Sequence, residues 1–220
     1  MKEPTMKDII TTIAERRRAI LPIRVYEILN RLDTDRDGIN QAFSWIVDLL
    51  SGKCIVFSGA IGSGKTVSAA FMACYYMWLI AKPVYDGLKD DPALLDGEEG
   101  RRFRDDDIFK AAINEGFRDN GFRWVKAEDV IQLEWSRYDS GYEYLLIIDD
   151  LGRDYFKPDS DFGPRRWDEL FDARYRDFLP TIITTNLTPK EFEARYGKRN
   201  RSRLREWGIW IEIAEKDLRQ

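Results

Sequence analysis

Hydrophobic residues along the chain form two alternating patterns. Short, uninterrupted apolar runs are typical of strands that are buried on both faces. They occupy residues 54–58, 122–125, 144–148, 181–186 and 209–213. Longer stretches with apolar residues at helical spacing predict helices, and these lie at 66–80, 127–137, 164–178 and 189–196. Strands that alternate with helices predict an α/β fold in three layers, with a five-stranded parallel sheet in the middle.

The first 40 residues are charged and have a helical pattern. Their apolar residues at near-helical spacing are Ile9, Ile10, Ile13 and Ile20. A second amphipathic stretch, residues 39–50, is expected to place Phe43, Ile46, Val47 and Leu50 on one face. Because no linker rich in Pro, Gly or Ser follows, we expect residues 1–40 to be a helical extension of a main domain at 41–220.

Residues 82–121 interrupt the alternating pattern. The segment is rich in aspartate and glutamate, and its first half also contains several glycines and prolines. This composition predicts an insertion on the surface that is mobile or partly ordered, with a short helix at 108–117. It is either a solvated excursion or an element that docks a partner.

The chain carries one motif with a defined chemistry, Gly-Ala-Ile-Gly-Ser-Gly-Lys-Thr at residues 59–66. It matches the phosphate-binding P-loop pattern G-x-x-x-x-G-K-[ST], between a predicted strand and a predicted helix. Glycines allow successive backbone N–H groups to surround phosphate, Lys65 supplies charge for the β- and γ-phosphates, and the Thr66 hydroxyl can bind Mg²⁺. The residues expected to contact ATP are Gly59, Ala60, Ile61, Gly62, Ser63, Gly64, Lys65, Thr66 and Val67.

Polar residues end two of the later apolar strands. Asp149 and Asp150 follow the run at 144–148, which is where P-loop proteins place their second motif. Asp149 is the candidate for the Mg²⁺ shell, and Asp150 for polarising the attacking water. Asn186 ends the next strand and is a candidate for a hydrogen bond to the γ-phosphate or to that water.

Composition excludes several other chemistries. The 220 residues include no histidine, so histidine-based triads, metal sites and general bases are excluded. Cys54 and Cys74 fall in a predicted strand and helix, where they are expected to be small buried residues of a reduced, cytoplasmic protein. The N-terminus does not have the pattern of a signal peptide. The longest apolar stretch, residues 71–81, is too short to cross a bilayer, so we expect no membrane partner.

The net charge of −4 means that any contact with nucleic acid has to come from a local basic patch. Such a patch is present between residues 195 and 205, where six basic residues occur without an acidic one. They are Arg195, Lys198, Arg199, Arg201, Arg203 and Arg205. The run is either a solvated helix face, a source of an arginine finger for a neighbouring subunit, or a binding site for nucleic-acid phosphates.

The order of these motifs resembles the DnaC/IstB type of AAA+ ATPase, which comprises bacterial helicase loaders and transposition helper proteins. The resemblance covers residues 45–80 and 122–219. Besides the P-loop, it is carried by the segments WVKAEDVI, YLLIIDDLG, PTIITTNLTPKEF, YGKRNRSRL and KDLR.

The resemblance implies an ATPase that uses ATP and Mg²⁺, with slow hydrolysis stimulated by assembly or DNA. Asn186 would be the sensor-1 residue, Arg203 the arginine finger that acts on a neighbour, and Arg219 a sensor-2 residue. The implied partners are single-stranded DNA at residues 195–205, a replicative helicase or transposase, and further copies of the chain. Two departures are the long segment at 82–121 and the expected lack of a C-terminal lid domain, because the sequence ends one residue after Arg219.

Two other functions fit part of this pattern. In a P-loop kinase for a small molecule, residues 82–121 would form a lid that brings Arg101, Arg102 and Arg104 to the transferred phosphate. A kinase mechanism of this kind assigns no role to Asn186 or to the segment around Arg203. The third hypothesis is a nucleotide-dependent interaction switch with little turnover.

Overall fold

The computed structural model describes residues 4–16, 21, 23–31, 44–89, 105–116, 121–130, 145–155 and 162–213. Within them, five strands form one sheet, and every pair of neighbouring strands is parallel. The strands are β1 (Cys54–Ser58), β2 (Phe122–Lys126), β3 (Leu145–Leu151), β4 (Thr181–Thr185) and β5 (Gly208–Glu212). Their order, β2-β3-β4-β1-β5, places β4 between the strand before the P-loop and the strand with the two aspartates. The predicted five-stranded parallel sheet is confirmed.

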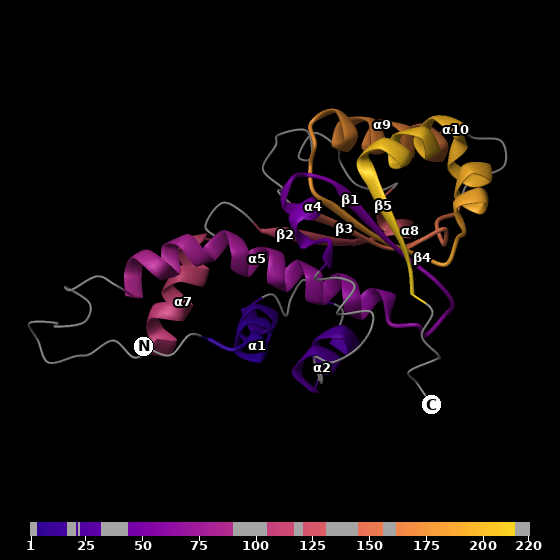
Figure 1. The fold of residues 1–220 in the computed structure, drawn as a ribbon. Coiled ribbons are helices and arrows are strands. Elements are labelled where there is room, and N and C mark those ends of the chain that lie inside the picture. Colours follow the sequence, from indigo (N-terminus) through magenta and orange to yellow (C-terminus); the bar gives the residue numbers. More distant parts are fainter. Residues whose placement is uncertain are drawn as a thin grey trace, which may run out of the picture.

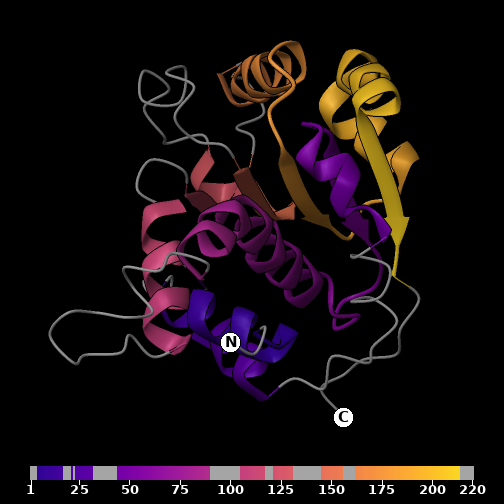
Figure 2. The same cartoon turned by 60° about the vertical axis from the view of Figure 1, so that its left-hand side comes forward.

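Helices cover both faces of the sheet, as Figures 1 and 2 show. One face carries α5 (Lys65–Lys89), on which α1 (Met6–Arg16), α2 (Ile23–Arg31) and α7 (Asp105–Gly116) pack. The other face carries α9 (Phe162–Arg176) and α10 (Pro189–Trp207). Two short helices, α4 (Ile46–Leu50) and α8 (Ala127–Val130), precede β1 and follow β2. Since both faces are covered, β1 and β4 are buried along their whole length.

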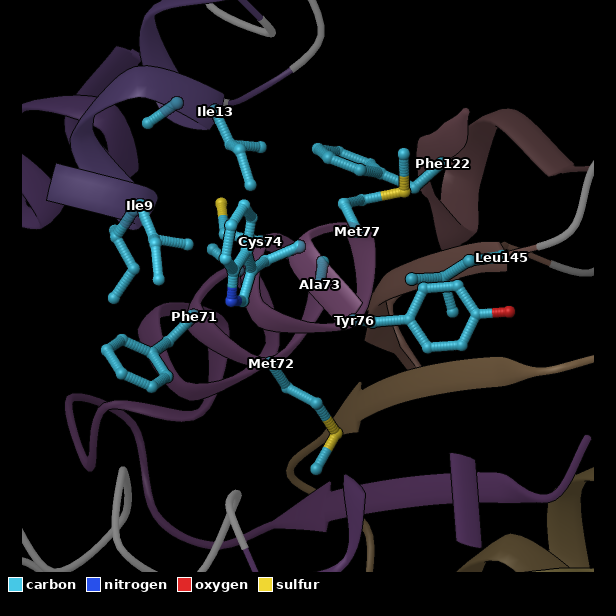
Figure 3. Packing of buried hydrophobic residues seen from close by; sticks show 14 of the residues in the cluster. Ile9, Ile13, Phe71, Met72, Ala73, Cys74, Tyr76, Met77, Phe122 and Leu145 are labelled. Carbon is cyan, nitrogen blue, oxygen red and sulfur yellow. The ribbon is translucent and has the colours of Figure 1, made fainter. Parts of the chain in front are cut away.

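Helix α5 forms the centre of the larger hydrophobic cluster. Figure 3 shows its side chains between α1 and the strands, with Ile13 on one side and Phe122 and Leu145 on the other. By length and hydropathy α5 could cross a membrane, but 67% of that window is buried inside the molecule. Its apolar surface is therefore used for packing within the domain.

The prediction of a surface insertion at 82–121 does not hold for either described end of that segment, although the short helix predicted within it is present. Residues 82–89 continue α5 through Pro83, and the predicted short helix is present as α7. The ring of Phe109 in α7 packs edge-on against Trp78 and Tyr85 of α5, with centroids 5.2 and 6.1 Å apart. Both ends therefore belong to the hydrophobic core, while residues 90–104 and 117–120 lie outside the described residues.

The extension at the N-terminus packs against the same core. Ile9, Ile10 and Ile13, which share the near-helical spacing noted in the sequence, are buried in α1, whereas Ile20 lies outside the described residues. The predicted shared face of residues 39–50 is wrong in its described part. Ile46 and Leu49 are buried, but Val47 and Leu50 are exposed. The helix has only five residues, and positions three apart are the ones that turn inward together.

Helix α10 is much longer than the predicted helix at 189–196. Thr188 caps it, because its hydroxyl accepts from the Glu191 N–H while the Glu191 carboxylate accepts from the Thr188 N–H. Gly197 has φ 88°, and the helix bends there and continues to Trp207. The basic run therefore lies on the second half of a bent helix. For the predicted helix at 127–137, α8 covers the start, and residues 131–144 lie outside the described residues.

Candidate active site

The P-loop joins β1 to α5 at the carboxyl edge of the sheet. Gly59 has φ 145°, and a Cβ there would lie 2.5 Å from the Ile213 carbonyl oxygen, so only glycine fits. The Ile213 N–H donates to the Ser58 carbonyl at 2.8 Å, which holds the residue after β5 against the start of the loop. Gly62 and Gly64 also have positive φ. The loop therefore has the turns that direct backbone N–H groups toward an anion in front of α5.

Lys65 begins α5, and its side chain is buried. Its ammonium group donates to the carbonyl oxygens of Ala60 and Gly59, at 2.6 and 3.0 Å. The lysine charge is thereby held across the loop. Among the other predicted loop residues, Ser63 is buried with a hydroxyl that has no hydrogen-bond partner in the described part of the chain, whereas Ile61 is exposed. Val67 is partly buried against the core of the α5 face.

Asp149 meets the P-loop helix directly. Leu145, Ile147 and Asp149 alternate along β3 on the face that carries α5, so the carboxylate emerges beside the start of that helix. One oxygen, Oδ1, accepts hydrogen bonds from Thr66 at 3.0 Å and from Thr184 at 2.6 Å. The structure thus brings together Lys65, Thr66 and Asp149, from segments more than 80 residues apart.

Burial raises the pKa of Asp149 above its ordinary value. The nearby Asp150 charge raises it as well, while the hydrogen bonds from Thr184 and Thr66 lower it. The Trp124 indole N–H also lowers the pKa of Asp149, although its geometry falls short of a hydrogen bond. A carboxylate that has lost hydration gains from a cation beside it.

The oxygen donors fit a magnesium ion. Mg²⁺ prefers oxygen ligands and is usually held by one or two protein groups together with phosphates and water. Asp149 and Thr66 supply a carboxylate and a hydroxyl 3.0 Å apart. The described residues contain no group of three or more His, Cys, Asp or Glu side chains able to hold a metal ion. These residues therefore suit a metal that arrives with a nucleotide.

Asp150 has a conformation that is uncommon for an aspartate. Its φ is 57°, and the ladder between β3 and β4 shifts register between Ile148 and Leu151. The Asp150 N–H donates to Thr184 Oγ1 at 2.9 Å, and its carboxylate pairs with Arg153 at 3.2 Å. Asp150 is thus placed beside Asp149 but turned away from it. Asn186 follows β4 at the same edge with an exposed side chain, and its role stays a prediction.

The basic run divides into buried and exposed residues. Arg203 is buried and donates to the Asp172 carboxylate of α9 and to Asn200 Oδ1, so its guanidinium is held inside its own subunit. The role of Arg203 as a finger stays a prediction, and it requires the guanidinium to leave these partners. Lys198, Arg199 and Arg205 are exposed, and Arg201 lies 5.6 Å from the Trp210 ring centre. Arg219 lies outside the described residues.

Two residues that hold the neighbourhood of Asp149 and Asp150 in place were not predicted from the sequence. Thr184 donates to the Asp149 carboxylate and accepts from the Asp150 N–H. In the sequence it is only a threonine near the end of a predicted strand, which does not point to this role. Asp154 is a buried carboxylate three residues after Leu151, the last residue of β3, and it is bonded to Trp167 and Tyr196. In the sequence it is one of many charged loop residues, so only the fold reveals it.

The cysteines take no part in this site. Cys54 and Cys74 are free and buried, as predicted. Burial raises the pKa of the Cys74 thiol to about 12 and that of Cys54 further still. Neither thiol is a nucleophile at neutral pH.

The chain is similar in fold to two solved structures that it covers almost completely. One structure is the DnaC helicase loader, with 20% sequence identity and a TM-score of 0.55, over 87% of this chain and 99% of that one. Another is DnaI, with 17% identity and a TM-score of 0.55, over 93% of this chain and 100% of that one. This chain therefore shares the fold of these two proteins. The sequence matches no protein-family model and no curated protein.

Proposed function

We propose that the chain is an ATP-binding and ATP-hydrolysing AAA+ protein that acts in DNA replication as a helicase loader. The observation that carries the proposal is the meeting of Lys65, Thr66 and Asp149 at the carboxyl edge of the sheet, with Thr66 Oγ1 3.0 Å from Asp149 Oδ1. These residues supply the three functions that an ATP·Mg²⁺ site needs, namely a cation for the phosphates, a hydroxyl ligand and a carboxylate.

Each residue of the site would make a different contact with ATP, Mg²⁺ or the attacking water. Backbone N–H groups at the start of α5 and the Lys65 ammonium would bind the β- and γ-phosphates. Thr66 and Asp149 would hold the Mg²⁺, which offsets the charge of the phosphates. Thr184 fixes the orientation of Asp149 through the bond at 2.6 Å. Asp150 would orient the attacking water, and Asn186 would contact the γ-phosphate or that water.

The remaining parts of the proposal concern assembly. The fold of a helicase loader supports a role with a replicative helicase, and the exposed cations of the basic run at 195–205 support binding to single-stranded DNA. In this scheme Arg203 of one copy completes the site of the next, so the chain works as a homo-oligomer. A transposase in place of the helicase is the other partner that the resemblance allows.

The experiment that tests the nucleotide site compares Lys65→Ala with Lys190→Ala, an exposed lysine of α10. Binding of a fluorescent ATP analogue and release of phosphate are measured for both variants and the parental chain. We expect Lys65→Ala to lose binding and turnover, because no other cation replaces the ammonium in the loop. Lys190→Ala should equal the parental chain. Full activity of Lys65→Ala would show that the site is assigned wrongly.

A further inference from the structure

Asp154 has the most completely buried carboxylate among the described acidic residues, with none of its side chain exposed. Its Oδ1 accepts from the Gly152 N–H at 3.2 Å and from the Tyr196 hydroxyl, and its Oδ2 accepts from the Trp167 indole at 3.1 Å. Arg195 lies 3.6 Å from Oδ2 and also donates to the Asp154 backbone carbonyl. A buried charge with this many donors fixes the positions of all of them.

The turn that Asp154 closes also sets the geometry of Asp150. The Arg153 N–H donates to the Asp150 carbonyl at 3.1 Å, and the Arg153 guanidinium pairs with the Asp150 carboxylate at 3.2 Å. Asp154 holds the other end of the turn through the Gly152 N–H. The segment from Asp150 to Asp154 is therefore one hydrogen-bonded unit attached to the end of β3.

The side-chain donors to Asp154 come from two helices. Trp167 belongs to α9, and Arg195 and Tyr196 belong to α10. Helix α10 starts three residues after Asn186 and carries the basic run, including Arg203. One carboxylate thus connects the turn with the water-orienting acid to the helix with the exposed cations.

In the described part of the chain, the hydrogen-bond partners of Asp154 include neither a P-loop residue nor Asp149. Asp149 is bonded to Thr66 and Thr184, and the Lys65 ammonium to carbonyl oxygens of its own loop. A change at Asp154 should therefore leave the affinity for ATP intact.

We propose that Asp154 is a positioning residue that couples the state of the nucleotide site to α10. It holds the turn of Asp150 in the geometry for hydrolysis, and it passes displacement of that turn to Arg195 and Tyr196. The inference rests on the proposed ATPase function, and it adds the route by which ATP would alter the surface that binds DNA.

Asp154→Asn tests the proposal, because asparagine keeps the size of the side chain and removes its charge. Its amide group also places a donor against the donors of Trp167 or Tyr196. We expect the Kd for the ATP analogue to stay within about twofold, and kcat to fall by about tenfold to a hundredfold, since displacements near 1 Å have effects of this size. Hydrogen exchange across residues 189–207 should respond to ATP in the parental chain and lose that response in Asp154→Asn.

Arg174→Met is the matched control. Arg174 is a buried charge too, and it belongs to α9. It donates to Thr181 at 2.9 Å and to Pro180 at 2.6 Å, at the amino end of β4 and away from the candidate site. We expect this variant to lower Tm while keeping kcat per bound nucleotide and the response of α10. Tyr196→Phe removes only one donor to Asp154, so it should shift kcat and exchange in the same direction by less, and it serves if Asp154→Asn does not fold.

The outcomes separate the two proposals. Parental kcat and a parental α10 response in Asp154→Asn, or in Tyr196→Phe if only that variant folds, would overturn the coupling while leaving the ATPase in place. Equal losses in Arg174→Met and Asp154→Asn, in proportion to the folded fraction, would show that Asp154 is structural only. Failure of the parental chain to bind the ATP analogue would overturn the proposed function, and the coupling with it.

Discussion

The two faces of the sheet are packed in different ways. On the face of α5 the core is built from aliphatic residues, methionines and aromatic rings. Among the described residues, the buried charges of this face are Lys65 and Asp149, and both lie at the candidate site. On the face of α9 and α10, buried charged groups lie both near the carboxyl ends of the strands and near their amino ends. They are Asp154, Arg174 and Arg203. The first face suits a fixed binding site, while the second has polar networks with directional bonds that set how two helices lie.

This contrast predicts separable effects. Changes at the site on the α5 face should remove binding of ATP or Mg²⁺. Changes in the networks of α9 and α10 should spare binding and alter turnover or assembly. The predictions below test that separation, in order of expected effect.

The largest effect is expected for Arg203→Ala. Loss of an arginine finger lowers turnover by about 10³-fold or more, with ATP binding retained. Turnover is measured at protein concentrations high enough for assembly. Arg205→Ala, an exposed arginine of the same helix, is the control and should keep turnover when no DNA is present. If Arg203→Ala hydrolyses ATP at the parental rate, Arg203 only bonds to Asp172 within its own subunit.

Asp149→Asn should lower Mg²⁺-dependent turnover by about 10²-fold, because a neutral amide stabilises the metal and the charge near it less well. Titration with Mg²⁺ measures the effect, and Asp177→Asn, an exposed aspartate paired with Arg176, is the control. Parental turnover at low Mg²⁺ would exclude Asp149 as a metal residue.

The same variant tests the pH dependence of stability. The pKa of Asp149 is raised in the folded chain, so the folded state binds its proton more tightly than the unfolded state does. Ionisation of Asp149 therefore lowers the free energy of unfolding as the pH rises from the ordinary aspartate range through the raised pKa. Without Mg²⁺, Asp149→Asn should be more stable than the parental chain at neutral pH, and the gain should disappear at acid pH. A neutral-pH loss of stability in chemical unfolding would contradict this explanation.

Ile13→Ala tests whether α1 belongs to the core of the α5 face. Ile13 is fully buried, so its truncation should lower the free energy of unfolding by about 2–5 kcal/mol. The measurement is urea unfolding, with the exposed Val47→Ala as a control expected to change stability little. A change near zero for Ile13→Ala would mean that α1 contributes nothing to the stability of the domain.

The smallest effect is expected at the cap of α10. Thr188→Ala removes the capping box and should lower the free energy of unfolding by about 1 kcal/mol. Thr5→Ala offers a comparison on the other face, because Thr5 and Asp8 exchange similar bonds at the start of α1. Thr188→Ala should also reduce turnover slightly, whereas Thr5→Ala should not. Equal turnover in both variants would argue against a link between α10 and hydrolysis.

The sequence predicted what is encoded by neighbouring residues. The P-loop, the strand that ends in Asp149 and Asp150, and the cap at Thr188 each depend on a few consecutive positions, and the structure contains all three as elements. The burial of Asp154 could not be predicted, because its partners Trp167 and Tyr196 are 13 and 42 residues away. The length of α10 was also missed, since Gly197 is usually a place where a helix ends and here it only bends one.

Contacts within residues 82–121, the acidic segment, could not be predicted from the sequence either. Its composition indicated a surface excursion, yet Phe109 of α7 completes an aromatic cluster with Trp78 and Tyr85. Tertiary packing of a few apolar residues outweighed the charges around them. The prediction for Val47 and Leu50 was wrong in the opposite direction, since both were expected on the buried face and both are exposed. A helix of five residues presents fewer positions to the core than a long periodic pattern suggests.

The measurement that tests the central claim most directly is ATP turnover per protomer as a function of protein concentration, with and without single-stranded DNA. A site completed by Arg203 of a neighbour predicts that turnover per protomer rises steeply with concentration and rises further with DNA. A rate that is independent of both would mean that each subunit holds a self-contained site, and it would contradict an ATPase assembled on DNA.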